Sequence, residues 1–404
     1  MPKLLVASTI PITIWSFLHP LVANLRGKGW IVDGAANGLP EESRCIGAFD
    51  HCYHVSWTRS PKNVRAALTG ARELRTIVGG GHYDIVHAHT PLAGFIARAA
   101  LSNLNGRSRP VVIYTAHGFH FHPQGTRLRN SVFRTVEKIA GRWTDFLVVV
   151  NKEDEAAALR YKVVPADRVV RVPGVGIELD RYSPAAIDLA KVKICRAELG
   201  LGENTPLILM LADFTPEKRH IDLLQALRLM RNRECHLVLA GDGPLLDATK
   251  QKAQALGIAD RVHFLGFRDD VPLLLHCAAV SVLPSSREGL PRAVMESLAM
   301  ETPVVASSIR GSAELLEGGG GLLYPVGDCG ELAQCLDQVL DQPERAREMG
   351  RRGAESMRAY ATDVMIARHL ELYARALRSR TSAGDCNISQ SCGGGSAGAY
   401  QLRM

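Results

Sequence analysis

The first half of the chain alternates short, nearly continuous apolar runs with longer stretches in which apolar residues have helical spacing. Apolar runs without polar alternation are typical of parallel strands that are covered on both faces. The pattern therefore predicts a doubly wound α/β unit. Its expected strands are residues 4–9, 32–37, 84–89, 111–117, 145–151 and 169–173, and its expected helices include residues 61–78 and 128–142.

The same alternation restarts after Pro184. Two successive series of strands and helices predict two Rossmann-like domains, at residues 1–180 and 196–362. Ligands of open parallel sheets bind beyond the carboxyl ends of the strands, so two facing sheets place the site in a central cleft. The expected strands of the second domain are residues 206–211, 236–240, 262–265, 280–284, 303–307 and 321–324.

The two ends of the chain are less regular. Residues 363–378 have the apolar spacing of a helix, whereas residues 379–404 are rich in Ser, Gly and Ala and are expected to form a disordered tail. The starting segment MPKLLVA is interpreted as the first core strand rather than a signal peptide. No run of about 18 apolar residues occurs, so no transmembrane helix is predicted and any membrane contact is expected to be peripheral.

Composition and charge add the expectation of an anionic ligand. The 404 residues are 46% hydrophobic and 22% charged, as in ordinary globular proteins. The net charge of +7 favours nucleic acid, phosphate esters or anionic lipid. Nucleic acid is not an expected partner, because no recognised module appears and the basic residues are dispersed. The nine cysteines are an odd number without C-x-x-C spacing, which predicts reduced thiols in a cytoplasmic protein.

The strongest chemical pattern follows the expected strand 280–284. Glu288 lies in a polar loop, and Pro291 opens a helix that contains Glu296. The amide groups at a helix N-terminus suit a phosphate, while Glu288 can accept hydrogen bonds from sugar hydroxyls and Glu296 from a ribose. Taken alone, the pattern fits equally well an ordinary helix with two solvated glutamates.

Several segments in order resemble one enzyme family. Glu288 to Glu296 resembles the E-x7-E signature of retaining family 4 glycosyltransferases, which have the GT-B fold, and residues 240–244, 262–267 and 302–307 resemble that family's neighbouring segments. The resemblance covers roughly residues 1–375. Residues 86–91 and 114–121 are similar to those of bacterial capsule and exopolysaccharide glycosyltransferases, whose acceptors are commonly lipid-linked sugars.

The resemblance implies roles for particular residues. His117, Glu288 and Lys218 would form the catalytic centre, with His117 and Glu288 positioning the donor sugar and Lys218 neutralising the diphosphate. The first domain would bind the acceptor and the second the donor, and the helix at 363–378 would return to the first domain. The implied donor-side residues are Glu296, Gly289, Leu290, Pro291, Arg292, Phe267, Arg268, Asp213 and Arg219, and the weaker acceptor-side candidates are Thr13, His89 and His120.

The implied reaction is transfer of a hexosyl or N-acetylhexosaminyl group, with retention, from a nucleotide-sugar. The family commonly uses UDP-linked donors, so UDP is the expected donor nucleotide. An undecaprenyl-type lipid-linked acceptor is the expected partner. The chain has no D-x-D triplet, so we expect no cofactor beyond the nucleotide-sugar co-substrate and a dispensable divalent metal. Two alternatives stay open: a UDP-sugar 2-epimerase of the same architecture, and a non-catalytic sugar-nucleotide-binding subunit.

Two segments depart from the family or bear on its partners. The family's arginine about five residues before Lys218 is missing, since that region reads Ala212-Asp213-Phe214, and Arg219 or another basic residue is a candidate replacement. Residues 127–143 predict a basic helix with apolar residues on one face. This helix either lies on anionic lipid at the cytoplasmic side of the membrane or buries its apolar face in the core.

Overall fold

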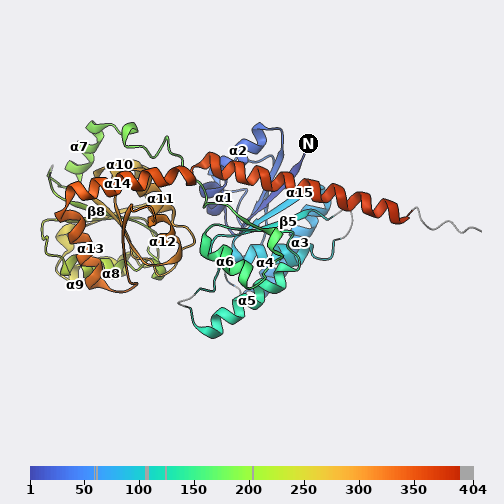
Figure 1. Ribbon diagram of the computed structural model, residues 1–404, viewed down its shortest axis with the longest axis horizontal. Helices are drawn as coiled ribbons and strands as arrows, with labels where there is room; N and C mark the ends of the chain where they lie inside the picture. Colours follow the sequence, from blue (N-terminus) through green and yellow to red (C-terminus); the bar gives the residue numbers. More distant parts are fainter. Residues whose placement is uncertain (59, 61, 105–108, 123–124, 203, 392–404) are drawn as a thin grey trace, which may run out of the picture.

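The protein has two lobes, each built on a parallel sheet with helices on both faces (Figure 1). The computed structural model describes residues 1–404 except 59, 61, 105–108, 123–124, 203 and 392–404. The seven strands of the first sheet lie in the order β3-β2-β1-β4-β5-β6-β7, and the six strands of the second in the order β10-β9-β8-β11-β12-β13. This is the doubly wound architecture that the apolar pattern predicts.

The first domain is built from the following elements. Its strands are β1 Lys3–Ala7, β2 Ile31–Ala36, β3 Cys52–His54, β4 Ile85–His89, β5 Val111–Ala116, β6 Phe146–Val149 and β7 Val169–Arg171. Its helices are α1 Pro11–Phe17, α2 His19–Gly27, α3 Val64–Gly81, α4 Pro91–Leu101, α5 Arg127–Gly141 and α6 Lys152–Arg160. The sequence missed only β3 among these strands, because Cys52–His54 is a short, half-buried edge strand without an apolar run.

The second domain repeats the plan. Its strands are β8 Leu207–Leu211, β9 His236–Ala240, β10 Val262–Gly266, β11 Val280–Leu283, β12 Val304–Ser307 and β13 Gly321–Tyr324. Its helices are α7 Leu189–Glu198, α8 His220–Leu229, α9 Leu246–Ala255, α10 Val271–Cys277, α11 Arg292–Ala299, α12 Arg310–Leu316, α13 Cys329–Asp341 and α14 Pro343–Met357. All six expected strands are confirmed to within one residue at each end.

In each sheet the order of the strands reverses at one point, and this point determines where a ligand site can form. In the first sheet β1 lies between β2 and β4, and in the second sheet β8 lies between β9 and β11. Loops that follow the strands on the two sides of such a point diverge and leave a crevice at the carboxyl edge of the sheet. The candidate residues His117, Lys218 and Glu288 lie in the loops that follow β5, β8 and β11 at these edges.

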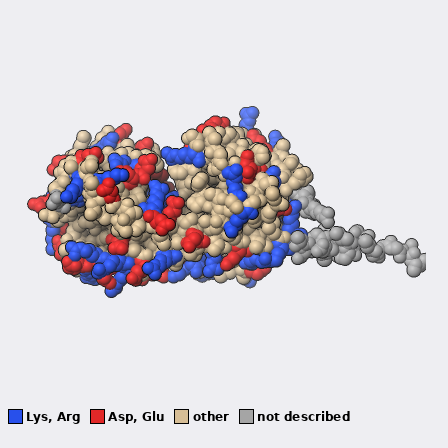
Figure 2. Space-filling view, turned by 90° about the horizontal axis from the view of Figure 1, so that it is seen from above, with Lys and Arg blue, Asp and Glu red and all other residues tan. Residues whose placement is uncertain are grey.

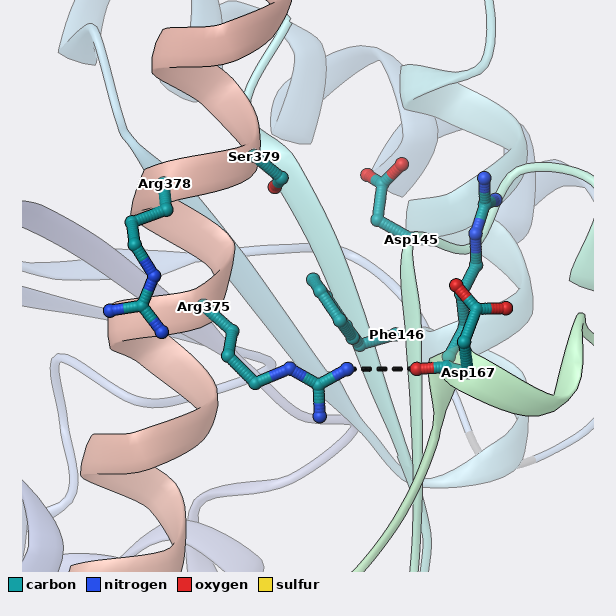
Figure 3. A pocket seen from close by; sticks show the side chains of 7 residues that line it. Asp145, Phe146, Asp167, Arg375, Arg378 and Ser379 are labelled. Atoms are coloured by element: carbon teal, nitrogen blue, oxygen red, sulfur yellow. Dashed lines mark hydrogen bonds between the residues drawn. The ribbon is translucent and has the colours of Figure 1, made fainter.

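The last helix, α15 (Thr362–Ser391), crosses back from the second lobe and packs on the first (Figure 1). Met365, Leu372 and Tyr373 are buried in the same core as residues of β1 and β4. Arg375 donates to the Asp167 carbonyl oxygen at 2.8 Å, beside the hollow shown in Figure 3. That hollow lies at the amino end of β6, at the edge of the sheet opposite to His117.

The carboxyl-terminal helix is longer than the sequence suggested. Helical backbone continues to Ser391, so residues 379–391 are not the disordered tail that their composition predicts; residues 392–404 lie outside the described part of the chain. Arg380 supplies a reason, because it donates to the Tyr83 carbonyl oxygen and pairs with Asp84. These contacts extend the docking of α15 beyond its apolar face.

The apolar face of α5 is exposed, which contradicts one of the two interpretations of this segment. Leu128 is 78% exposed and Val132 is 53% exposed, and Val136 and Ile139 are also open to solvent. The helix instead turns Glu137, Ala140 and Gly141 to the core. Burial of the apolar face was therefore the wrong alternative. No helix among the described residues is long and apolar enough to cross a bilayer.

Candidate active site

Two loops from different domains touch at Gly289. A β-carbon on Gly289 would lie 1.7 Å from the carbonyl oxygen of His117, and one on Gly118 would lie 3.0 Å from the Gly289 α-carbon. Such close backbone approach requires glycine at position 289. The Asn151 side chain also donates to the Gly289 carbonyl oxygen at 3.1 Å. The contact places the loop that carries Glu288 against the loop that carries His117, and Figure 2 shows the surface hollowed between the two lobes.

Glu288 and Lys218 form an ion pair in this region. The Lys218 Nζ donates to Glu288 Oε1 at 2.7 Å, and both side chains are half-buried. Lys218 ends a short 3₁₀ turn, Pro216–Lys218, that follows β8, and Glu288 follows β11. Because β8 and β11 are neighbours in the sheet, their carboxyl-end loops bring the cation and the carboxylate together.

The helix α11 holds Glu296 in a network of its own. The Tyr182 hydroxyl donates to Glu296 Oε1 at 2.7 Å, and Arg292 Nε donates to the same oxygen at 2.8 Å. Arg292 also reaches the Ser16 carbonyl oxygen in the first domain. Pro291 is the residue that caps α11, one position before the helix proper, instead of its first helical residue. The amide groups of the first turn still point out of the helix at this end.

Four histidines and a tyrosine line the other side of the contact, in the first domain and on α15. His117 Nε2 lies 3.1 Å from His89 Nδ1, and the ring of His89 lies 4.2 Å from the ring of His87. His87 in turn contacts the Tyr373 hydroxyl at 2.7 Å, and His369 lies 5.8 Å from the His87 ring. Burial lowers the pKa of His117 to about 4 and that of His369 to about 4, and it lowers the pKa values of His87 and His89 well below 6.5. These imidazoles are therefore neutral at pH 7.

We predict that acidification destabilises the fold through this cluster. Between pH 6.5 and about 4 these histidines are protonated in the unfolded chain but stay neutral in the folded protein. The free energy of unfolding therefore falls as the pH falls. For His369, which is 4% exposed, the shift corresponds to on the order of 3 kcal/mol. Urea unfolding at pH 7 and pH 4.5 measures the effect, and His369→Leu should reduce it. An equal free energy of unfolding at both pH values would contradict the prediction.

A buried arginine joins the two domains behind the contact. Arg310 Nη1 pairs with Asp154 at 2.6 Å, Nη2 donates to the Phe119 carbonyl oxygen at 2.6 Å, and Nε donates to the Glu288 carbonyl oxygen at 3.0 Å. Asp154 belongs to the first domain and is 1% exposed. Burial raises the pKa of the Asp154 carboxyl, and Arg310 opposes that rise. The guanidinium thus holds both site loops at once.

The residues expected around the nucleotide base are dispersed at the cleft edge. Phe267 is 60% exposed, and the Arg44 guanidinium of the first domain lies 5.5 Å from its ring centre. Arg268 pairs with Asp270 of the following turn. Leu290 packs near Gly174, where an added β-carbon would lie 2.8 Å from it.

The remaining expected residues are Arg219, Asp213, Thr13 and His120, and their recorded contacts are with residues other than Glu288 and Lys218. Arg219 pairs with Asp222 at 2.6 Å, so its guanidinium is engaged on α8 rather than with the pair. Asp213 is exposed in the loop after β8. Thr13 is buried in α1, and the ring of His120 lies 5.0 Å from that of Phe133.

The sequence assigned no role to three residues that make these contacts: Arg310, Asp154 and Tyr182. Their partners are separated by more than 100 positions in the chain, so no local spacing signals them. Among the described residues, no group of three or more His, Cys, Asp or Glu side chains is placed to hold a metal ion.

Two family profiles match the chain, one on each lobe. The family described as "Glycosyl transferase 4-like domain" matches residues 13–174, and "Glycosyl transferases group 1" matches residues 192–356. The chain belongs to the family 4 glycosyltransferases, and its two facing Rossmann-like domains form the GT-B fold.

Relatives and solved structures agree with this assignment. The Bacillus subtilis protein provisionally named glycosyltransferase EpsD is 30% identical over 92% of this chain and 96% of its own length. The Escherichia coli UDP-Gal:alpha-D-GlcNAc-diphosphoundecaprenol alpha-1,3-galactosyltransferase is 29% identical over 64% of this chain and 67% of its own. The crystal structure of Anabaena Alr3699/HepE in complex with UDP superimposes with a TM-score of 0.76 at 19% identity, covering 93% of this chain and 100% of that one.

Proposed function

We propose that the protein transfers a hexosyl or N-acetylhexosaminyl group, with retention, from a UDP-sugar to a lipid-linked acceptor. The observation that carries the proposal is the Lys218–Glu288 ion pair at the carboxyl ends of β8 and β11, against the loop of His117. The UDP in the HepE crystal structure and the diphosphoundecaprenol acceptor in the name of the galactosyltransferase relative support the choice of donor and acceptor.

In this proposal each residue acts through charge or hydrogen bonding. Lys218 and the amide groups after Gly289 neutralise the diphosphate as the bond between it and the sugar breaks. The acceptor oxygen attacks from the same face, and its proton passes to the departing diphosphate oxygen, so no side chain is assigned as the base. His117 and Glu288 position the sugar, and Glu296 holds the ribose. His117 acts as a neutral imidazole, because its pKa is about 4.

The division of labour between the domains is part of the proposal. Residues 1–180 would bind the acceptor and residues 196–362 the donor, with α15 joining the second lobe to the first. Because protein groups supply the positive charge at the diphosphate, we propose that a divalent metal is dispensable and that transfer persists in a chelator.

A donor screen tests the proposal. The purified protein is incubated with individual UDP-hexoses and UDP-N-acetylhexosamines and with undecaprenyl-type lipid-linked sugars, and products are detected by mass spectrometry. We expect transfer from at least one UDP-sugar, with the anomeric configuration retained in the NMR spectrum of the product. Conversion of the donor in the absence of acceptor would instead indicate an epimerase. Binding of UDP-sugars without turnover on any acceptor would indicate a non-catalytic subunit.

We further propose that α5 contacts an anionic bilayer surface. Its exposed apolar side chains are flanked by basic residues, and this combination inserts shallowly among lipid headgroups. Such contact would place the cleft near a lipid-linked acceptor. The exposed apolar residues are Leu128, Val132, Val136 and Ile139, and the flanking basic residues are Arg127, Arg134, Lys138 and Arg142.

Acidic substitutions on this apolar face should weaken membrane binding. We expect the double variant Leu128→Glu, Val132→Glu to bind vesicles containing phosphatidylglycerol at least tenfold more weakly, because it removes apolar contact and adds repulsion. Co-sedimentation with vesicles measures the change. Leu229→Glu, on α8, is the matched control, since Leu229 is also an exposed leucine. Equal sedimentation of the double variant and the wild type would rule out α5 as the contact.

A further inference from the structure

A second hollow, of about 390 Å³, opens between the two domains beside the proposed reaction centre. The first domain contributes His122 and Arg129, and the second contributes Glu217 and Arg287 among others. Glu217 directly precedes Lys218, and Arg287 directly precedes Glu288. The ion pair of the proposed donor site and this hollow are therefore built from adjacent residues of the same two loops.

Positive charge exceeds negative charge around this hollow, because two arginines, Arg129 and Arg287, and one carboxylate, Glu217, line it. Burial lowers the pKa of Arg287, and the guanidinium groups of Arg129 and Arg310 lower it further, while Glu217 and Glu288 oppose them. Glu288 is bonded to Lys218, and Arg310 is paired with Asp154. Among the residues that the structure describes, the Arg287 guanidinium makes no hydrogen bond or ion pair.

Burial and the same positive charges also lower the pKa of the His120 ring. Burial is the main cause of its lowered pKa of about 4, and Arg287, Arg129 and Arg310 add to it. Like charges brought together in a partly buried place repel one another, and a bound anion would remove that repulsion. Two arginines from different domains, with His122 beside them, thus form a site suited to a phosphate or diphosphate group.

The position of the hollow favours the acceptor over the donor as the source of that group. The donor diphosphate is proposed to lie at Lys218 and the start of α11, which are both in the second domain. The hollow instead has walls from both domains, and the first domain, which is proposed to bind the acceptor, contributes His122 and Arg129. Arg129 lies next to Leu128, where the exposed apolar face of α5 begins.

We propose that Arg129 and Arg287, with His122, bind the diphosphate through which the acceptor sugar is linked to its lipid. This rests on the proposed function as a transferase acting on a lipid-linked acceptor. In this arrangement the acceptor sugar extends toward Glu288 and the lipid extends along α5 toward the bilayer. The pocket would thereby select acceptors that carry a diphosphate.

Inorganic pyrophosphate is the probe for a direct test. It is titrated by calorimetry, in metal-free buffer with saturating UDP, into the wild type, Arg287→Gln, Arg129→Gln and Arg345→Gln. Saturating UDP fills the donor site, so pyrophosphate must bind elsewhere. We expect wild-type binding to weaken at least tenfold in Arg287→Gln and Arg129→Gln and to stay within twofold in Arg345→Gln, whose exposed arginine lies on α14. Absence of saturable binding, equal binding by all four proteins, or an adventitious ion only, bound with no dependence on either arginine, would overturn the proposal.

Transfer kinetics then assign the group to the acceptor. We expect Arg287→Gln to raise the KM for a sugar-diphospholipid acceptor at least tenfold and to leave the KM for the UDP-sugar within twofold. A raised donor KM with an unchanged acceptor KM would overturn the assignment. If the wild type transfers no sugar to any acceptor, the proposed function fails on its own, and the pyrophosphate titration still decides whether the pocket binds anions.

Discussion

Glu288→Ala is expected to lower kcat/KM for sugar transfer by roughly 10²–10³-fold, the usual cost of removing one group that stabilises a transition state. The carboxylate is the partner of Lys218 at 2.7 Å, and its loss would remove the proposed contact to the sugar and free the cation that is proposed to face the diphosphate. Lys218 is partly open to solvent and can turn to water, so the fold should survive. Steady-state kinetics with the donor identified in the screen measure the change.

The distribution of this loss between kcat and KM is informative. We expect mainly a lower kcat, because interactions made in the transition state but not in the ground state appear there. The affinity for UDP, measured by calorimetry, should change little, since Glu288 is proposed to contact the sugar and not the nucleotide. Glu355→Ala on α14 is the control for a lost exposed carboxylate. Unchanged transfer by Glu288→Ala would remove Glu288 from the site.

Arg310→Ala is expected to shift the protein toward an arrangement with the domains apart. The substitution leaves the Asp154 carboxylate, which is 1% exposed, without its cation. An unpaired buried charge of this kind destabilises a fold by about 4 kcal/mol. Separation of the domains hydrates Asp154 and relieves that cost. Small-angle X-ray scattering should therefore show a larger radius of gyration, and kcat/KM should fall because the loops of His117 and Glu288 separate.

The conservative variant separates charge from geometry. Arg310→Lys keeps the cation but cannot make the three contacts of the guanidinium with Asp154, Phe119 and Glu288, so we expect an intermediate effect. Arg352→Ala, which removes an exposed arginine paired within α14, is the control. An unchanged scattering profile for Arg310→Ala would show that this arginine does not hold the domains together.

Much of the fold follows from local pattern. Strand β9, for example, was predicted with the bounds that the structure has, because a strand covered on both faces is largely apolar. The short strand β3 was missed for the opposite reason, since it lies at the edge of the sheet and none of its residues is fully buried. The extension of α15 past residue 378 was also missed, because Arg380 contacts a strand loop that lies almost 300 positions earlier.

The candidate site likewise contains residues that the sequence identified and residues that it did not. The E-x7-E segment and His117 were identifiable because each lies within one short motif whose resemblance to a family is visible in the sequence. Arg310, Asp154 and Tyr182 were not, because each contact joins residues that are more than 100 positions apart in the chain. Arg219 was a reasonable replacement for the missing arginine by sequence distance, yet its guanidinium turns to Asp222.

The sequence by itself determined two doubly wound domains, the E-x7-E segment and the family, because apolar periodicity and contiguous motifs are local properties. Only the tertiary structure decided that Glu288 pairs with Lys218, that Arg310 joins the lobes, that α5 exposes its apolar face and that Arg129 and Arg287 share one hollow. Each of these depends on which strands are neighbours and how the domains face each other. A periodicity states that a helix has an apolar face, but packing decides whether that face meets protein or solvent.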